Sequence, residues 1–358
     1  MNHLPPSIIA DRPARAPEPA PGAERAPLTR AQAGALLARH ADHPSAFLAL
    51  NHGTAHFAVP GLEGFIAYRP HGRFLFQLGG GFARGDARRL LLERFRLFAR
   101  GQQKRICAVQ LQPDDIALYR QAGFSINQMG SCYAMDLRQF SPAGRHFVKL
   151  RNKANQARRA GIEVAELGAD LPRTTEMWEQ LDVITRSWLR AKGRYTKLIE
   201  FMIGELGQSD QAERRVFVAH LGARVIGFIS YVPVYGRRPG VLHDITRRVA
   251  DAPPGVMEWI NLNAIARFQR EGIAHLHFGL SPFAGLCAEH DGVEGRSRLL
   301  SRLATLIAAH GDFIYPSRTQ ERYKLKWQPH YVAPEYIGFE GGFSLTGLWR
   351  LLQLTKTV

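Results

Sequence analysis

The apolar positions in the first half of the chain fall into short runs that are typical of β-strands. Such runs lie at 46–50, 56–59, 64–68 and 74–78, and a Leu- and Arg-rich segment with helical spacing follows at 86–100. This alternation predicts a small α/β unit. Its other expected elements are a helix capped by Thr29, a strand at 106–111, a short helix at 114–122, and strands at 124 and 131–137.

The second half repeats this alternation of strands and helices. Its expected elements are a strand at 162–167, helices at 173–191 and 196–206, a three-stranded meander at 216–221, 224–234 and 240–246, a helix at 255–271, a strand at 275–280, a helix at 299–310 and an extended segment at 323–338. This order is typical of the GNAT acyltransferase fold. The sequence therefore predicts an α/β (α+β) protein with two tandem GNAT-like domains, at 29–144 and 161–340.

Two flanking segments differ from these domains in composition. Residues 1–28 hold seven prolines and six alanines, which predicts a disordered arm, because so few large apolar side chains cannot offset the entropy of ordering. The tail at 341–358 is amphipathic and contains Trp349 among several leucines. It is expected either to lie on an anionic bilayer or to dock on the neighbouring domain.

The segment at 145–160 is expected to form a basic helix that joins the two domains. At 100° per residue, Phe147, Leu150, Ala154 and Ala157 share one face, and the opposite face carries cationic and amide side chains without any acid. A solvated connector helix is the alternative, but such a helix usually mixes charges of both signs. The pattern favours an anionic partner for this face.

The charge balance of the whole chain also favours polyanionic partners. Its 358 residues include 47 Lys and Arg against 31 Asp and Glu, a formal net charge of +16. Nucleic acid, anionic lipid and acidic metabolites all suit such an excess, although a general bias toward arginine is the alternative. No apolar run is long enough to predict a membrane-spanning helix, and the N-terminus lacks the apolar region of a secretory signal.

The cysteines and histidines predict neither a disulfide framework nor a metal site. The three cysteines form no CxxC pair and are expected to be reduced, buried side chains. His275 and His277 share one face of a predicted strand, and His290 follows. Without a third ligand at fixed spacing, packing or hydrogen bonding is the expected role of this pair.

The turn before the helix at 255–271 lacks the glycine-rich pattern by which acetyltransferases hold the CoA pyrophosphate. It contains Asp251, Pro253 and Pro254. The two prolines remove two backbone donors, and the aspartate adds negative charge. CoA is therefore not expected in the second domain, whereas the glycines at 79–81 are an alternative phosphate cradle in the first.

Two charged motifs of the second half are candidates for chemistry. Asp244 and Arg247 end a predicted central strand and are expected to face the cleft where such sheets splay, with a surface ion pair as the alternative. Arg322, Lys324 and Lys326 alternate with apolar residues, so they are expected to line one face of a strand. Three cations on one face suit phosphate binding, and an edge strand guarded by lysines is the alternative.

Taken together, four stretches resemble the C-terminal catalytic domain of the phosphatidylglycerol lysyltransferase family. They are Leu150-Arg-Asn-Lys-Ala-Asn, Asp244-Ile-Thr-Arg-Arg followed by Pro254-Gly-Val-Met-Glu, Phe278-Gly-Leu-Ser-Pro, and Arg322-Tyr-Lys followed by Trp327-Gln-Pro and Tyr331. The resemblance covers about residues 45–340. This chain departs from the family pattern at Thr246, in place of Met, and at Trp327, in place of Phe.

The resemblance implies an enzyme that moves an aminoacyl group from charged tRNA onto a hydroxyl acceptor, with phosphatidylglycerol as the first expectation. The aminoacyl ester is already activated, so aminoacyl-tRNA serves as co-substrate and no cofactor is expected. The expected partners are charged tRNA, an anionic phospholipid or membrane surface, and a separate membrane flippase. The expected location is cytoplasmic, or peripheral on the inner face of the plasma membrane.

The resemblance also implies roles for particular residues. Asp244 would orient the hydroxyl, act as general base or bind the ammonium of the amino acid, and Arg247 would hold a phosphate or the oxyanion. The catalytic set is Asp244, Arg247 and Lys324. The phosphate- and lipid-binding set is Arg248, Arg322, Lys326 and Trp327. The tRNA-binding set is Lys149, Arg151, Lys153, Arg158 and Arg159.

Three other functions stay open from the sequence. A soluble small-molecule acceptor would replace the lipid in the same tRNA-dependent reaction. A CoA-dependent N-acyltransferase would need a pyrophosphate loop. A non-catalytic RNA- or membrane-binding module would bind tRNA whether or not the tRNA is aminoacylated.

Overall fold

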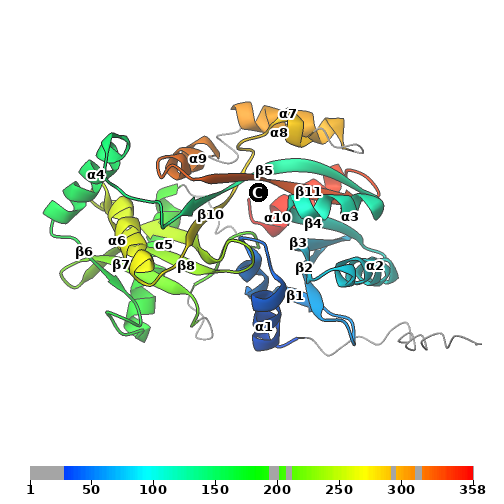
Figure 1. Ribbon diagram of the computed structural model, residues 1–358, viewed down its shortest axis with the longest axis horizontal. Helices are drawn as coiled ribbons and strands as arrows, with labels where there is room; N and C mark the ends of the chain where they lie inside the picture. The colour runs from blue at the N-terminus through cyan, green and yellow to red at the C-terminus, as the bar shows by residue number, and fades with distance from the viewer. Residues whose placement is uncertain (1–27, 193–200, 207–211, 292–295, 311–316, 358) are drawn as a thin grey trace, which may run out of the picture.

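The computed structural model describes residues 28–192, 201–206, 212–291, 296–310 and 317–357 (Figure 1). Within these ranges, eleven strands form one continuous sheet, and apolar clusters with their covering helices lie on both of its faces. The predicted mixed α/β class is therefore confirmed. The arm predicted at 1–28 lies outside the described residues except for Leu28.

The order of strands in the sheet differs from their order in the chain. In chain order they are β1 (Ala55–Phe57), β2 (Gly64–His71), β3 (Phe74–Ala83), β4 (Arg105–Leu111), β5 (Phe124–Asp136), β6 (Glu163–Glu166), β7 (Arg215–Leu221), β8 (Arg224–Val234), β9 (Gly240–Arg248), β10 (His275–Pro282) and β11 (Tyr331–Glu340). In the sheet they run β1-β2-β3-β4-β11-β5-β10-β9-β8-β7-β6. β5 joins the two halves by pairing with β10, and β11 lies between β4 and β5. The last strand of the predicted C-terminal domain thus belongs to the N-terminal half of the sheet.

A β–α–β unit occurs in each half of the chain. Helix α2 (Asp86–Gly101) connects β3 to its parallel neighbour β4, and helix α6 (Val256–Arg270) connects β9 to its parallel neighbour β10. Parallel neighbours require such a crossover, and a helix commonly supplies it. The predicted three-stranded meander of the second half is confirmed as antiparallel β7, β8 and β9.

The remaining helices match most of the sequence predictions. They are α1 (Arg30–His40), α3 (Ile116–Gln121), α4 (Val148–Arg159), α5 (Thr175–Lys192), α7 (Ala288–Asp291), α8 (Arg298–His310), α9 (Ser317–Leu325) and α10 (Leu345–Leu354), with 3₁₀ turns η1 (Ala46–Leu50), η2 (Pro113–Asp115) and η3 (Arg145–Phe147). Thr29 caps α1 in a capping box with Gln32, as expected. No helix in the described ranges is both long and apolar enough to cross a bilayer.

Three local predictions differ from the structure. The run at 46–50 forms the turn η1 rather than a strand; all five of its side chains are buried, and periodicity does not separate a buried strand from a buried helical turn. β5 is one long strand rather than two, because it pairs with β10 on one side and β11 on the other. Residues 201–206 are bent and irregular, and the rest of the helix predicted at 196–206 lies outside the described residues.

The basic helix α4 buries the face that its sequence predicts. Leu150, Ala154 and Ala157 are buried in the core of the second half, and Phe147 packs partly against it. A fully buried leucine contributes about 1.5–3 kcal/mol, so Leu150 is the main apolar anchor of this helix. α4 lies along α6 at the edge of the molecule (Figure 1).

Candidate active site

The candidate site lies where β9 and β10 separate. β10 pairs with β9 only over His275–His277, whereas its pairing with β5 continues to Pro282. The two strands therefore diverge after this short parallel ladder. The three residues predicted as catalytic, Asp244, Arg247 and Lys324, belong to the elements beside this opening.

A β-bulge in β9 places Asp244 and Arg247 on the same face of the sheet. In a regular strand, residues three apart point to opposite faces. Here His243 pairs with Tyr231 and Thr246 pairs with Ile229, so β9 has one more residue than β8 across this step. The extra residue reverses the alternation, and the charge of Asp244 acts on Arg247 as a result.

Asp244 is held by a buried ion pair that the sequence did not indicate. Its Oδ2 pairs with the guanidinium of Arg214, and its Oδ1 accepts a hydrogen bond from the backbone N–H of Gly204 at 2.9 Å. A Cβ at position 204 would lie 1.7 Å from Oδ2, so only glycine fits beside this carboxylate. Asp244 therefore fastens three chain segments to one another.

Arg247 is a buried cation without a carboxylate partner among the described residues. Only 9% of the residue is exposed, and its guanidinium lies 4.0 Å from the ring centre of Trp188. One guanidinium nitrogen donates to the Thr246 carbonyl, whereas the buried Nε has no hydrogen-bond partner in the described part of the chain. Burial lowers its pKa to about 10, so the side chain stays charged at neutral pH.

Lys324 enters the opening between the strands from α9. Its ammonium donates to the carbonyls of Gly279 and Leu280, both at 2.8 Å, on the part of β10 that has left β9. Burial lowers the pKa of Lys324 to about 7, although nearby acidic groups, Glu335 first, act in the opposite direction. A neutral amine has two N–H groups and one lone pair; the two carbonyls occupy the N–H groups and leave the lone pair free.

These groups can supply two elements of acyl-transfer chemistry. A lysine with a pKa near the working pH can take a proton from a hydroxyl nucleophile. A buried guanidinium can stabilise a developing oxyanion or hold a phosphate, because electrostatic interactions are stronger away from water. Lys324 and Arg247 have the chemical properties that these two functions require.

The predicted strip of three cations is wrong, because its residues are not in a strand. Arg322 and Lys324 lie in helix α9, where residues two apart point in roughly opposite directions. Arg322 is accordingly exposed and Lys324 is buried. Tyr323 and Trp327 are four residues apart, which is a helical spacing. This spacing indicated the secondary structure of the segment better than the alternation of its cations did.

Lys326 and Trp327 are also placed differently from the prediction. The ammonium of Lys326 pairs with Glu258 at 2.8 Å and lies 3.8 Å from the ring centre of Tyr323. Trp327 is fully buried, so its indole has no surface to offer a lipid. Arg248, the fourth member of the predicted phosphate- and lipid-binding set, is exposed at the end of β9.

The predicted tRNA-binding residues mostly share the exposed face of α4. Lys149, Lys153, Arg158 and Arg159 are exposed. Arg151 differs, because its guanidinium donates to the carbonyls of Pro142 and Gly144 at 2.5 and 2.6 Å and so fixes the preceding turn. Lys153 also pairs with Glu258 at 3.6 Å, so Lys149, Arg158 and Arg159 are the three cations of this set that are exposed without an ion pair among the described residues.

Comparison with known proteins places this arrangement in a family. The family described as phosphatidylglycerol lysyltransferase, C-terminal, matches residues 34–339. The chain belongs to this family. The match includes β1 to β10, β11 as far as Phe339, and the helices α2 to α9, and it confirms the resemblance that the sequence motifs indicate.

Individual relatives of the phosphatidylglycerol lysyltransferase family are distant. The chain is 24% identical to the phosphatidylglycerol lysyltransferase of Bacillus subtilis, over 73% of this chain and 30% of the relative. It is 27% identical to the bifunctional lysylphosphatidylglycerol biosynthesis protein LysX of Nocardia farcinica, over 62% of this chain and 19% of the relative. The chain thus spans less than a third of the length of these two curated relatives.

A solved structure shares the fold. The C-terminal domain of a putative lysylphosphatidylglycerol synthetase from Agrobacterium fabrum superimposes with a TM-score of 0.73. The alignment covers 92% of this chain and 96% of that domain, at 19% sequence identity. The sheet that carries the opening between β9 and β10 is therefore common to both proteins.

Sequence reasoning missed several residues that shape the site. Arg214, Trp188 and Glu258 each contact a predicted site residue, and none was singled out. Arg214 precedes a predicted strand and looks like an ordinary surface charge in the sequence. Glu258 lies inside one of the family motifs, which was the available signal, whereas nothing marked Trp188.

Proposed function

We propose that this chain transfers an aminoacyl group from charged tRNA to a hydroxyl group of phosphatidylglycerol. Family membership supports the reaction class, and one observation supports the site: the amine of Lys324 has a pKa of about 7 and lies in the opening between β9 and β10. In this proposal Lys324 takes the proton of the attacking hydroxyl, and Arg247 stabilises the tetrahedral oxyanion. Asp244 positions the strand that carries Arg247.

The proposal assigns the base to Lys324 rather than to Asp244. Both oxygens of Asp244 already have partners, in Arg214 and Gly204, and the carboxylate is almost fully buried. Lys324 has a free lone pair when it is neutral. The hydroxyl proton moves to this amine as the new ester bond forms. The bond between the aminoacyl carbonyl carbon and the 3′ oxygen of the tRNA then breaks, and Lys324 returns the proton to that oxygen.

One contact argues against a CoA-dependent reaction at the second β–α–β unit. The N-terminus of α6, where a pyrophosphate would lie in a CoA enzyme, is covered by α4. The Lys153 carbonyl oxygen lies 1.9 Å from where a Cβ of Gly255 would be. Backbone of the basic helix thus occupies the space that a pyrophosphate would need.

The proposed enzyme consists of two domains. The repeated β–α–β unit supports two tandem GNAT-like domains joined by α4. Because β11 lies between β4 and β5, the C-terminal domain would contribute this strand to the N-terminal domain. A cytoplasmic location, peripheral membrane contact and a separate flippase remain predictions from the family resemblance.

The direct test is the transfer of radiolabel from a set of charged tRNAs, with phosphatidylglycerol vesicles present. Label from one tRNA in the chloroform phase is the expected result, and it identifies the amino acid. Label that leaves the tRNA but stays in the aqueous phase would support a soluble acceptor instead. Label that stays on every tRNA would contradict both forms of the proposal.

The exposed face of α4 is expected to bind the tRNA backbone. Replacing Lys149, Lys153, Arg158 and Arg159 together by glutamine should weaken tRNA binding and reduce the slope of log affinity against log salt by as much as about 3, since each phosphate contact releases about one counterion. Filter binding across a salt series measures both effects.

A charge-matched variant provides the control for this experiment. Replacing four exposed arginines elsewhere removes the same charge: Arg89, Arg186, Arg190 and Arg224. This variant should keep most of the salt slope. Equal losses in the two variants would mean that tRNA responds to net charge rather than to α4.

Helix α10 is expected to contact the lipid surface. Its residues Leu345 and Trp349 are 60% and 52% exposed, whereas Gly347 and Leu351 on the other side are buried. Replacing both Leu345 and Trp349 by serine should weaken flotation with phosphatidylglycerol vesicles by about tenfold or more, since each side chain loses part of the 1.5–3 kcal/mol of burial.

Serine at Leu97 and Leu221, two exposed leucines of other elements, is the matched control. This control should float as the unmodified protein does. Unchanged flotation of the α10 variant would assign this helix to the fold alone.

A further inference from the structure

Trp188 reaches Arg247 from helix α5, which packs across β8 and β9. The buried stripe of α5 runs through Leu181 and Ile184, both 2% exposed, which belong to the apolar core of the second half. Trp188 follows Ile184 by four positions and so continues the same stripe. Here the ring covers a cation, because the central carbon of the Arg247 guanidinium lies 4.0 Å from the ring centre.

Within the described residues, the polar contacts of Arg247 are confined to its own strand. Its hydrogen bond goes to the carbonyl of the adjacent Thr246, and its Nε has no hydrogen-bond partner. The charge of Asp244 acts on Arg247, but both oxygens of that carboxylate already have other partners. The indole of Trp188 is therefore the group from another element that can hold this guanidinium in place.

An aromatic face can hold a guanidinium without neutralising it. A carboxylate in the place of Trp188 would form an ion pair and cancel the positive charge, whereas a ring attracts the cation through its quadrupole. At 4.0 Å from the central carbon, the ring contacts the face of the guanidinium, and the N–H groups point outward in the guanidinium plane. Because Arg247 is only 9% exposed, this attraction is stronger than at a solvated surface.

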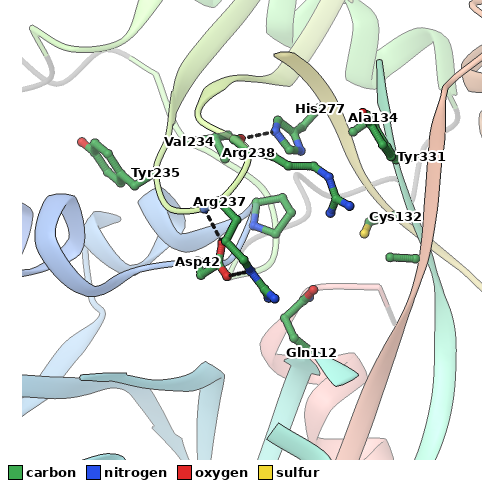
Figure 2. A pocket seen from close by; sticks show the side chains of 12 residues that line it. Asp42, Gln112, Cys132, Ala134, Val234, Tyr235, Arg237, Arg238, His277 and Tyr331 are labelled. Atoms are coloured by element: carbon green, nitrogen blue, oxygen red, sulfur yellow. Dashed lines mark hydrogen bonds and ion pairs between the residues drawn. The ribbon is translucent and has the colours of Figure 1, made fainter. Parts of the chain in front are cut away.

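Another arginine–aromatic contact shows what distinguishes this one. Arg238 lies 4.4 Å from the ring centre of Tyr331, at the small pocket between the hairpin of β8 and β9 and the strands β5, β10 and β11 (Figure 2). Arg238 is exposed, and Arg237 next to it pairs with Asp42. Water screens the first of these charges, and a carboxylate neutralises the second. Arg247, by contrast, is buried against its ring and has no carboxylate partner among the described residues.

We propose that Trp188 is a positioning residue for aminoacyl transfer, whose indole holds the Arg247 guanidinium where the oxyanion of the transition state develops. The inference rests on the proposed function, which assigns the stabilisation of this oxyanion to Arg247. Trp188 acts through Arg247 and does not contact the reacting atoms. Its loss should therefore lower kcat and leave the KM for charged tRNA unchanged, since the oxyanion is absent from the ground state.

Fluorinated tryptophan tests this role with little change in the shape of the ring. Each fluorine withdraws electron density from the ring face and weakens its attraction for a cation. The chain contains five tryptophans, so the fluorinated series is prepared both in the unmodified protein and in Trp188→Phe. The kcat is expected to fall with each added fluorine in the unmodified protein and to stay constant across the Trp188→Phe series.

Trp188→Leu removes the aromatic face and is expected to lower kcat by about 5–30-fold, the value of a desolvated cation–π contact. Trp178→Leu on the same helix is the matched control, because Trp178 packs against the apolar core. This control should leave kcat unchanged. Thermal unfolding checks that both variants fold, and the fluorinated series decides the question if Trp188→Leu does not.

A nuclear magnetic resonance measurement without tRNA or lipid separates this inference from the proposed function. The ring current of the indole is expected to move the Nε–H resonance of Arg247 upfield. This resonance is identified by its loss in Arg247→Lys, and it should return to the ordinary arginine range in Trp188→Leu.

Two results would overturn the inference: no upfield shift in the unmodified protein, or a kcat that does not respond to fluorine although transfer occurs. No transfer by the unmodified protein would instead overturn the proposed function. In that case the shifted resonance would still show that Trp188 holds Arg247.

Discussion

Replacing Lys324 by glutamine is expected to lower the rate of aminoacyl transfer by about 10²–10⁴-fold, the usual contribution of a positioned general base. Glutamine keeps the ability to donate to the carbonyls of Gly279 and Leu280, which hold the amine at 2.8 Å. It cannot take a proton. Initial rates of label transfer from charged tRNA into phosphatidylglycerol measure the effect, and Lys104→Gln, on the loop before β4, is the control.

The pH dependence of the transfer rate is a second test of Lys324 as the base. Since burial lowers the pKa of Lys324 to about 7, the fraction of neutral amine rises with pH through this value. The rate is therefore expected to rise between about pH 6 and 8 and then to level off. Lys324→Arg keeps the positive charge without a titratable amine, and a rate close to that of the unmodified protein would contradict the assignment of the base.

The depressed pKa of Lys324 also predicts how stability depends on pH. The unfolded chain binds a proton at this lysine up to its ordinary pKa of 10.5, whereas the folded chain releases it above about 7. Burial of the charged amine therefore lowers the free energy of unfolding by its full amount below pH 7, and this destabilisation disappears as the pH rises toward 10.5. Lys324→Gln should remove this part of the pH dependence in denaturant unfolding.

Replacing Arg214 by methionine is expected to lower the free energy of unfolding by about 3–5 kcal/mol, because the buried carboxylate of Asp244 would lose its ion-pair partner. The side chains of Arg214 and Asp244 are only 1% and 4% exposed. Chemical denaturation measures the loss. Replacing Asp244 by leucine in the same protein should restore part of it, since neither buried charge would remain.

A matched ion pair on the surface provides the control. Arg224 and Asp251 also pair, at 3.1 Å, but their side chains are 62% and 65% exposed. Arg224→Met should cost about 0–1 kcal/mol. If Arg214→Met cost no more than this control, the buried pair would not hold the segments together as inferred. Asp244→Asn then separates the two roles of Asp244, because an effect on stability without an effect on transfer assigns it to positioning alone.

The helices and strands that could be predicted from the sequence are those with a clear periodic spacing of apolar residues. Helix α4 is the clearest case. The apolar spacing of Leu150, Ala154 and Ala157 fixes which face is buried and leaves the cations on the other. The meander of β7, β8 and β9 is another, because each strand is a compact apolar run between turns. Family membership was also readable, from four motifs taken together.

The partners of the charged residues required the tertiary structure. Asp244 pairs with Arg214, which directly precedes β7 and lies 30 residues earlier in the chain, and no local pattern encodes that contact. The shared face of Asp244 and Arg247 depends on one extra residue in β9, which is visible only when β8 is aligned beside it. Lys324 owes its lowered pKa to burial in the gap between two strands that are distant from it in the chain.

The sequence by itself determined the alternation of strands and helices, the basic face of α4 and the family, because these depend on spacing between near neighbours. The tertiary structure decided where β11 inserts, which cations are buried, and where a pocket forms from both halves of the chain. The physical reason is that burial and pairing are properties of surfaces brought together by folding. Lys324, for example, is buried against the carbonyls of Gly279 and Leu280, which lie 45 and 44 residues earlier in the sequence.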